Sequence, residues 1–191
     1  MKLLFIPLLA MLVLSVAPIA QAQQIWSAEL RAGANLPIDD LGDIALDPGF
    51  GFDGTVAYQI SPVLSAYAGW GWHQFDADTP NGSPDVEQTG YVIGVQATRA
   101  LTDSRFALRA RGGLTYEHIE IENNRGDIVE DTGHSAGVEF GAAVVYSMND
   151  RFSLTPGIRY RFLSRDVEFG TTNDSVDLSY FALDIGVAWA F

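Results

Sequence analysis

The last twelve residues of the chain alternate between large apolar side chains and small or polar ones. Because successive side chains of a β-strand point to opposite faces, this period of two predicts a strand with one apolar face. The apolar face comprises Phe181, Leu183, Ile185, Val187, Trp189 and Phe191, and the opposite face comprises Tyr180, Ala182, Asp184, Gly186, Ala188 and Ala190. Since a tilted strand of about ten residues crosses a bilayer, the segment predicts a membrane-spanning strand.

The same alternation, bounded by turn residues, recurs along the chain and predicts eight strands. They cover residues 25–36, 49–60, 63–75, 89–100, 105–121, 134–147, 151–168 and 176–191. Tight turns at residues 61–62, 101–104 and 148–150 alternate with longer acidic loops at residues 38–48, 76–88, 122–133 and 170–175. This alternation of short and long connections is typical of outer-membrane barrels. We therefore predict an all-β fold, an eight-stranded antiparallel up-and-down transmembrane β-barrel with both termini at the short-turn end.

The first residues have the features of a secretory signal peptide. Lys2 precedes an apolar run from Leu3 to Ile19, and the small-residue sequence Ala20-Gln21-Ala22 follows it. We therefore assign residues 1–22 to a cleaved signal peptide and residues 23–191 to one barrel domain.

The strand face opposite the apolar one carries charges of both signs among glycine and alanine. The interior of an eight-stranded barrel is just wide enough for its own side chains, and an arginine facing lipid costs about 2–4 kcal/mol near the bilayer midplane. We therefore expect the charged face to line the lumen and the apolar face to contact lipid. The predicted lumen ion-pair network comprises Glu29, Arg31, Asp53, Arg109, Arg111, Glu139, Arg159, Arg161 and Asp184.

If the first, third and last long loops turn near Gly42, Gly126 and Thr171–Thr172, the hairpin registers bring opposite charges of this network together. The pairs are Arg31 with Asp53, Arg159 with Asp184 and, diagonally, Arg111 with Glu139. Because buried charges are costly unless they are paired, we interpret the network as a plug. A gated ion path is the functional alternative.

Aromatic residues are expected at both membrane interfaces. One girdle, at the short-turn end, comprises Trp26, Tyr58, Phe106, Tyr146, Phe152, Trp189 and Phe191. The other, at the loop end, comprises Phe50, Phe52, Trp70, Trp72, Tyr91 and Tyr116. Pro156 interrupts the seventh strand, and since proline cannot donate a ladder hydrogen bond, we expect a β-bulge there.

With these features the chain resembles the small eight-stranded outer-membrane barrels, the OmpA N-terminal barrel and OmpX-like family. The resemblance implies a Gram-negative outer membrane, extracellular loops, periplasmic termini and a monomer in contact with lipid and lipopolysaccharide. It also implies an assembly signal, read by the outer-membrane assembly machinery, that comprises Tyr180, Phe181, Leu183, Ile185, Val187, Trp189 and Phe191.

Composition excludes several other functions. The formal net charge of −13 argues against nucleic acid as a partner, because phosphates attract basic proteins. The chain contains no cysteine, so its stability cannot depend on disulfides. No sequence pattern calls for a cofactor or a defined metal site.

Three histidines are the candidates for chemistry. His73 falls on the lumen face, where we expect a satisfied interior side chain. His118 and His134 fall on the outward face near the loop end, and a hairpin tip at Gly126 makes them cross-strand neighbours. With Glu120 beside them they form a possible metal or acid–base cluster.

Some barrels of the class that this chain resembles modify lipid A with a histidine and a serine two residues later. Here Ser135 directly follows His134, and Ala136 occupies the required position. We therefore predict a non-enzymatic scaffold that presents acidic extracellular loops for surface interaction. The alternatives are a narrow pore for small or hydrophobic solutes and a lipid A-modifying enzyme.

Overall fold

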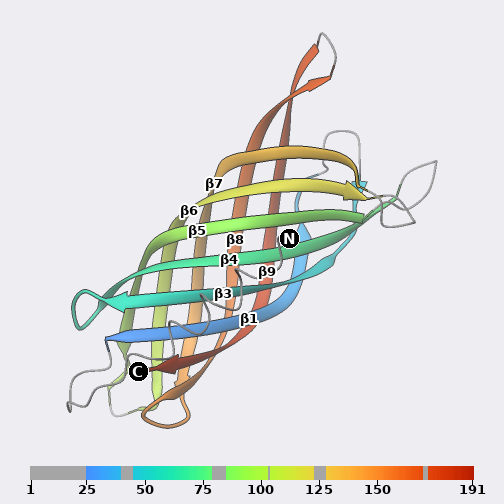
Figure 1. Ribbon diagram of the computed structural model, residues 1–191. Coiled ribbons are helices and arrows are strands. Elements are labelled where there is room, and N and C mark those ends of the chain that lie inside the picture. Colours follow the sequence, from blue (N-terminus) through green and yellow to red (C-terminus); the bar gives the residue numbers. More distant parts are fainter. Residues whose placement is uncertain (1–24, 40–44, 79–84, 103, 123–127, 170–171) are drawn as a thin grey trace, which may run out of the picture.

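The computed structural model describes residues 25–39, 45–78, 85–102, 104–122, 128–169 and 172–191. The predicted signal peptide lies outside these residues. Eight long antiparallel strands form a barrel (Figure 1): β1 (Trp26–Pro37), β3 (Gly49–Gln59), β4 (Leu64–Asp78), β5 (Asp85–Ala100), β6 (Phe106–Glu122), β7 (Ile128–Ser147), β8 (Phe152–Phe169) and β9 (Thr172–Ala190). A two-residue strand, β2 (Ala45–Leu46), pairs with the end of β4.

The sheet closes on itself. Each long strand pairs with its neighbours in sequence, and β1 pairs with β9 from Ser27 opposite Ala190 to Pro37 opposite Tyr180. The prediction of an eight-stranded up-and-down barrel is therefore confirmed. No helix in the part of the chain that the structure describes has the length and apolarity needed to cross a membrane.

Short turns join the strands at one end of the barrel, the short-turn end, as predicted. In the turn between β7 and β8, the Asn149 side-chain oxygen accepts hydrogen bonds from the backbone N–H groups of Arg151 and Phe152, both at 2.9 Å. In the turn between β3 and β4, Ser61 Oγ accepts one from the N–H of Leu64 at 3.1 Å. These side-chain bonds replace ladder bonds where the chain reverses.

At the other end, the loop end, the strands are longer than predicted. The expected loops at residues 76–88, 122–133 and 170–175 are largely strand, since β4 and β5 pair out to Asp76 and Asp85 and the β8–β9 ladder continues to Phe169 and Thr172. The prediction failed there because acidic side chains occupy water-facing positions of strands as well as loops. The segments at residues 40–44, 79–84, 123–127 and 170–171 lie outside the described residues.

Two register predictions in β8 and β9 are wrong. The β7–β8 pairs have the same register on both sides of Pro156, so no bulge is inserted, and the ladder merely lacks pairs between Ala143 and Tyr146. A missing donor breaks hydrogen bonds without requiring an extra residue. In the last hairpin, Asp184 lies opposite Gly157, two residues from the predicted partner Arg159, because the whole β8–β9 ladder is shifted by two residues from the assumed register.

The two faces of the wall have the predicted orientation. Leu30, Ile93 and Leu114 are 71, 65 and 64% exposed on the outside of the barrel, whereas Arg31 and Arg159 are buried inside it. The aromatic girdles contain cross-strand ring pairs, including Trp26 with Tyr58 at 4.9 Å and Phe106 with Tyr146 at 5.1 Å between centroids. Phe50 packs on Trp72 at 5.3 Å in the loop-end girdle.

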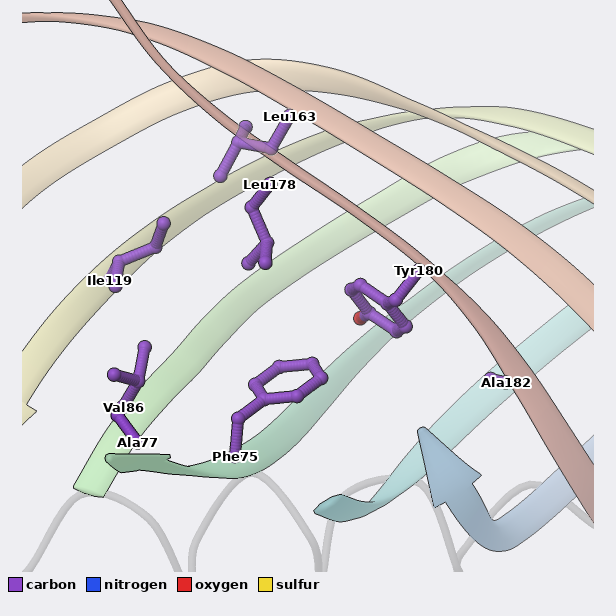
Figure 2. Packing of buried hydrophobic residues seen from close by; sticks show 8 residues of the cluster. All are labelled: Phe75, Ala77, Val86, Ile119, Leu163, Leu178, Tyr180 and Ala182. Carbon is purple, nitrogen blue, oxygen red and sulfur yellow. The ribbon is translucent and has the colours of Figure 1, made fainter. Parts of the chain in front are cut away.

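The buried apolar core lies inside the barrel at the loop end (Figure 2). This apolar layer comprises Phe75, Ala77, Val86, Ile119, Leu163, Leu178, Tyr180 and Ala182. The Phe75 and Tyr180 rings meet edge to face, with their centroids 5.0 Å apart. A lumen with an apolar layer was not predicted, since the inward face was expected to be polar or small.

Candidate functional site

The structure brings all nine predicted lumen residues together and adds Glu117 to them. β1 supplies Glu29 and Arg31, β6 supplies Arg109, Arg111 and Glu117, β8 supplies Arg159 and Arg161, and β3, β7 and β9 supply Asp53, Glu139 and Asp184. We call these ten residues the lumen network. They meet because each occupies the inward parity of its strand, which follows from the period of two.

Arg159 lies at the centre of the lumen network. Its guanidinium group contacts three carboxylates from three different strands: Asp184 through Nε at 2.6 Å, Glu139 through Nη1 at 3.1 Å, and Asp53 through Nη2. The Asp184 contact is a diagonal one, which explains why this ion pair forms although the predicted register was wrong.

Arg161 makes a second set of contacts on the side of the apolar layer. Nη2 lies 2.6 Å from Asp53 Oδ1 and 2.7 Å from Glu139 Oε2, and Nη1 lies 3.0 Å from Glu117 Oε1. Arg159 and Arg161 therefore share two carboxylates, which join β3 and β7 to β8 across the lumen.

A third group of contacts lies toward the short-turn end. Arg31 bridges Glu29 and Asp184 at 3.0 Å each, and Arg109 Nη1 lies 3.2 Å from Glu29 Oε1. The Thr155 hydroxyl donates a hydrogen bond to the same Glu29 carboxylate. Because Arg31 and Asp184 belong to β1 and β9, their ion pair crosses the seam that closes the barrel.

Arg111 completes the network with an aromatic partner that sequence reasoning did not assign to it. Arg111 Nη2 lies 2.9 Å from Glu139 Oε1, and the guanidinium carbon stacks 4.1 Å from the centroid of the Tyr67 ring. The Tyr67 hydroxyl donates to Glu139 at 3.2 Å. The inward parity of Tyr67 and Glu117 was the available signal for both residues.

His73 is buried in the lumen, as predicted. Its Nδ1 lies 3.2 Å from Asn35 Nδ2, and its Nε2 lies 2.6 Å from Arg161 Nη1 and 3.4 Å from Asp53 Oδ1. It therefore links the lumen network to the apolar layer, where its ring faces that of Tyr180 at 5.6 Å.

Glycines on the inward face make room for the arginines. A Cβ atom on Gly141 would lie 2.8 Å from Arg159 Cγ and 3.0 Å from Arg111 Cγ. A Cβ atom on Gly186 would lie 2.9 Å from Arg31 Cγ. The glycines at these two positions are thus required by the space that the aliphatic stems of the arginine side chains occupy.

Taken together, the lumen network fills the barrel with five guanidinium groups and five carboxylates, each within 4 Å of at least one opposite charge. Such a balanced set avoids the cost of an unpaired buried charge. Toward the short-turn end it borders a mouth of about 300 Å³, lined in part by Ser27, Gln96, Thr98 and Arg109.

At the loop end, the outward face of β6 and β7 carries the predicted histidine pair. His118 lies directly opposite His134, and their rings stack with centroids 4.6 Å apart and planes 9° apart. His118 Nδ1 lies 3.7 Å from Glu120 Oε1 and 3.5 Å from Asp131 Oδ1. Asp131 was not predicted as a member of this group, because the sequence analysis places it in the expected acidic loop at residues 122–133.

The serine expected to point away from this histidine pair does so. Ser135 Oγ donates to the carbonyl oxygen of Ser164 on β8 at 3.0 Å. The described residues at this rim therefore present imidazoles and carboxylates to the outside, with the serine hydroxyl directed to a backbone carbonyl.

The predicted assembly signal forms the end of β9. Phe181, Leu183, Ile185, Val187, Trp189 and Phe191 are exposed on the outer face, whereas Tyr180 is buried in the lumen. β9 and the carboxy-terminal Phe191 therefore present a continuous apolar face to the outside of the barrel.

Comparison with known proteins identifies a family and several solved structures that are similar to this barrel. The family model for the outer membrane protein beta-barrel domain matches residues 6–191, whereas no curated protein matches the chain by sequence. Among solved structures, Neisserial surface protein A is similar with a TM-score of 0.62 at 15% identity, covering 88% of this chain and 98% of that chain. OprG of Pseudomonas aeruginosa is similar with a TM-score of 0.55 at 15% identity, covering 91% of this chain and 99% of that chain.

A third similar structure carries a ligand. Ail, the attachment invasion locus protein of Yersinia pestis, was crystallised with the heparin analogue sucrose octasulfate; its TM-score is 0.50 at 11% identity, covering 87% of this chain and 99% of that chain. At these identities the likeness concerns the fold alone. The family match spans the described barrel, and so the chain belongs to the family of outer membrane protein beta-barrel domains.

Proposed function

We propose that this protein is a non-enzymatic scaffold of the Gram-negative outer membrane, a closed barrel that presents acidic loop-end residues for surface interaction. One observation carries the proposal: the ten charges of the lumen network are paired with one another across the interior, and nine of them belong to side chains that are at most 7% exposed. A barrel of this size is filled by its own side chains, so ions have no continuous aqueous path.

The orientation in the membrane is part of the proposal. The loop end is extracellular and the short-turn end, with the carboxy terminus, is periplasmic, which is the usual arrangement of outer-membrane barrels. Lipid and lipopolysaccharide surround a monomer, and the outward apolar face of β9 serves the assembly machinery during insertion.

The charge of the loop end determines which surfaces it would contact. Described acidic residues near this end include Asp39, Asp47, Asp76, Asp85, Glu87, Glu120, Glu122, Asp131 and Asp177. Carboxylates gathered on one surface attract cations and basic partners and repel anions. A sulfated polysaccharide analogue such as the one bound by Ail is therefore a poor match for this chain, and a basic protein surface is a better one.

Planar-bilayer conductance of the refolded protein tests the closed lumen, with a heat-modifiability gel shift to show that the barrel has folded. We expect a folded barrel without single-channel steps. A double variant, Arg159→Ala with Arg161→Ala, removes two guanidinium groups from the centre and is expected to give charge-sensitive openings.

Arg151→Ala is the matched control, because Arg151 is exposed at the short-turn mouth and outside the lumen network. It should remain as silent as the native barrel. Reproducible steps in the native protein would overturn the scaffold in favour of a pore, with the lumen network acting as its gate. Loss of a lipid A modification on deletion of the protein would favour the enzyme instead.

A further inference from the structure

Three side chains on the outer wall of β6 and β7 form a cluster of potential metal ligands. They are His118, Glu120 and Asp131, and one ligand atom from each lies within 4.8 Å of the other two. The group lies just beyond Tyr116 of the loop-end girdle, where outward side chains change from apolar to polar, so it faces the aqueous side of the interface.

A β-bulge creates this group. Between the pairs His118–His134 and Glu120–Asp131, two residues of β7, Thr132 and Gly133, oppose the single residue Ile119 of β6. The extra residue reverses the facing of Asp131, which would otherwise point into the barrel. Bulges often re-aim a side chain at a functional position.

The bulge is stabilised by its own side chains. The Thr132 hydroxyl accepts a hydrogen bond from the Ile119 N–H at 3.0 Å and donates one to the Ile119 carbonyl at 2.8 Å. Gly133 has a φ of 66°, a left-handed conformation that glycine adopts readily. Asp131 is thus held on the outer face by a defined local structure.

The two distances from the His118 imidazole nitrogen are close to those of a tetrahedral ion. Zinc bonds of about 2.0–2.2 Å to histidine nitrogen and carboxylate oxygen place neighbouring ligand atoms about 3.3–3.6 Å apart. His118 Nδ1 lies 3.5 Å from Asp131 Oδ1 and 3.7 Å from Glu120 Oε1. An imidazole ligand favours zinc and other first-row transition metals over Ca²⁺ and Mg²⁺, which prefer oxygen alone.

We propose that His118, Glu120 and Asp131 form a binding site for a divalent transition-metal ion, with Zn²⁺ as the best match, on the outer wall at the base of the β6–β7 hairpin. Solvent occupies the fourth position. The ion links β6 to β7 at the bulge, where the backbone ladder is irregular, and the His134 ring supports the His118 imidazole by stacking on it at 4.6 Å.

The proposal is tested by titrating zinc chloride into the refolded, chelator-treated barrel in detergent and measuring binding by calorimetry. We expect one ion per chain. His118→Ala and Asp131→Asn should each raise the dissociation constant at least about tenfold, the usual minimum loss on disturbing a metal shell. Cobalt absorption gives a second readout, since four-coordinate and six-coordinate ions differ in intensity.

The control must separate this site from a neighbouring carboxylate group, Glu87, Glu120 and Glu122, which shares Glu120. Glu122→Gln and Glu87→Gln break that group and leave the proposed ligands His118 and Asp131 intact, so binding should be unchanged. A folded native barrel without saturable binding overturns the proposal. Equal binding by His118→Ala, or an equal loss in Glu122→Gln, also overturns it, because the ion would then sit among carboxylates alone.

Discussion

Between the two aromatic girdles, the apolar side chains of the barrel wall face outward and the charged ones face inward. Beyond the loop-end girdle, the apolar side chains of the same strands face inward and the polar ones face outward. Along β6, Leu114 and Tyr116 face outward and are followed by Glu120, while the inward positions change from Glu117 to Ile119. Side chains still alternate between the two faces, but the apolar ones now point inward and the polar ones outward.

The inversion follows the solvent. Apolar side chains face lipid where lipid surrounds the wall, and they face the interior where water surrounds it. The lumen therefore has a charged layer at membrane level. The apolar layer lies toward the loop end, and its side chains are those of Figure 2. The following predictions test whether these two layers stabilise the barrel by different physical terms.

The largest effect is expected in the charged layer. Arg161→Ala leaves Asp53, Glu117 and Glu139 with fewer positive partners inside the barrel, and removing one member of a buried ion-pair network costs about 3–5 kcal/mol. The free energy of unfolding, measured by denaturant titration in vesicles, should fall by that amount. In the exposed control Arg151→Ala it should change by less than about 0.5 kcal/mol; equal losses in both variants would refute a special role for the network.

The apolar layer should show a smaller loss through a cavity. Leu163 is 1% exposed and packs in this layer, so Leu163→Ala should lower the free energy of unfolding by about 2–4 kcal/mol. Leu163→Met keeps the volume and should cost less than about 1.5 kcal/mol. A loss in the methionine variant as large as in the alanine variant would show that shape, rather than cavity volume, decides.

The third prediction tests how tightly the arginine side chains pack against the neighbouring glycines. The Cβ of Gly141→Ala would press on the Cγ atoms of Arg159 and Arg111, and overpacking of this kind costs about 1–3 kcal/mol. Gly54→Ala is the matched control, because its Cβ meets one Leu30 atom at 3.5 Å. Thermal unfolding should distinguish the two variants, and an unchanged melting temperature for Gly141→Ala would indicate a looser lumen than the structure has.

The smallest expected effect is that of salt concentration on the destabilisation caused by Arg161→Ala. Buried pairs are screened much less than exposed ones, so the destabilisation by Arg161→Ala should change by less than about 0.5 kcal/mol between about 0.1 M and about 1 M sodium chloride. A strong salt dependence, measured by repeating the denaturant titration, would mean that water enters the charged layer.

The membrane-level region could be predicted from the sequence because both faces carry a signal there. In β8, Arg159 and Arg161 alternate with Ile158 and Tyr160, so parity alone assigned the charges to the lumen. The diagonal reach of arginine also made the Arg159–Asp184 contact insensitive to a register error of two residues.

The loop-end region could not be predicted in the same way. Val86 lies in a segment whose acidic residues predict a loop. Phe75 and Leu178 lie near the ends of predicted strands at inward positions, where polar or small side chains are expected, so the sequence did not indicate a second core there. Asp131 was missed because the acidic segment at residues 122–133 predicts a loop, and nothing in the composition of β7 indicates the bulge that turns Asp131 outward.

The ion pair between Arg31 and Asp184 has a consequence for the order of events in folding. Its partners are separated by 153 residues, and they belong to the first and last strands. Contacts of such long range form late, since loop closure must precede them. The first and last strands therefore pair only after β9 has formed. The same step that closes the barrel also pairs the Arg31 and Asp184 charges inside it.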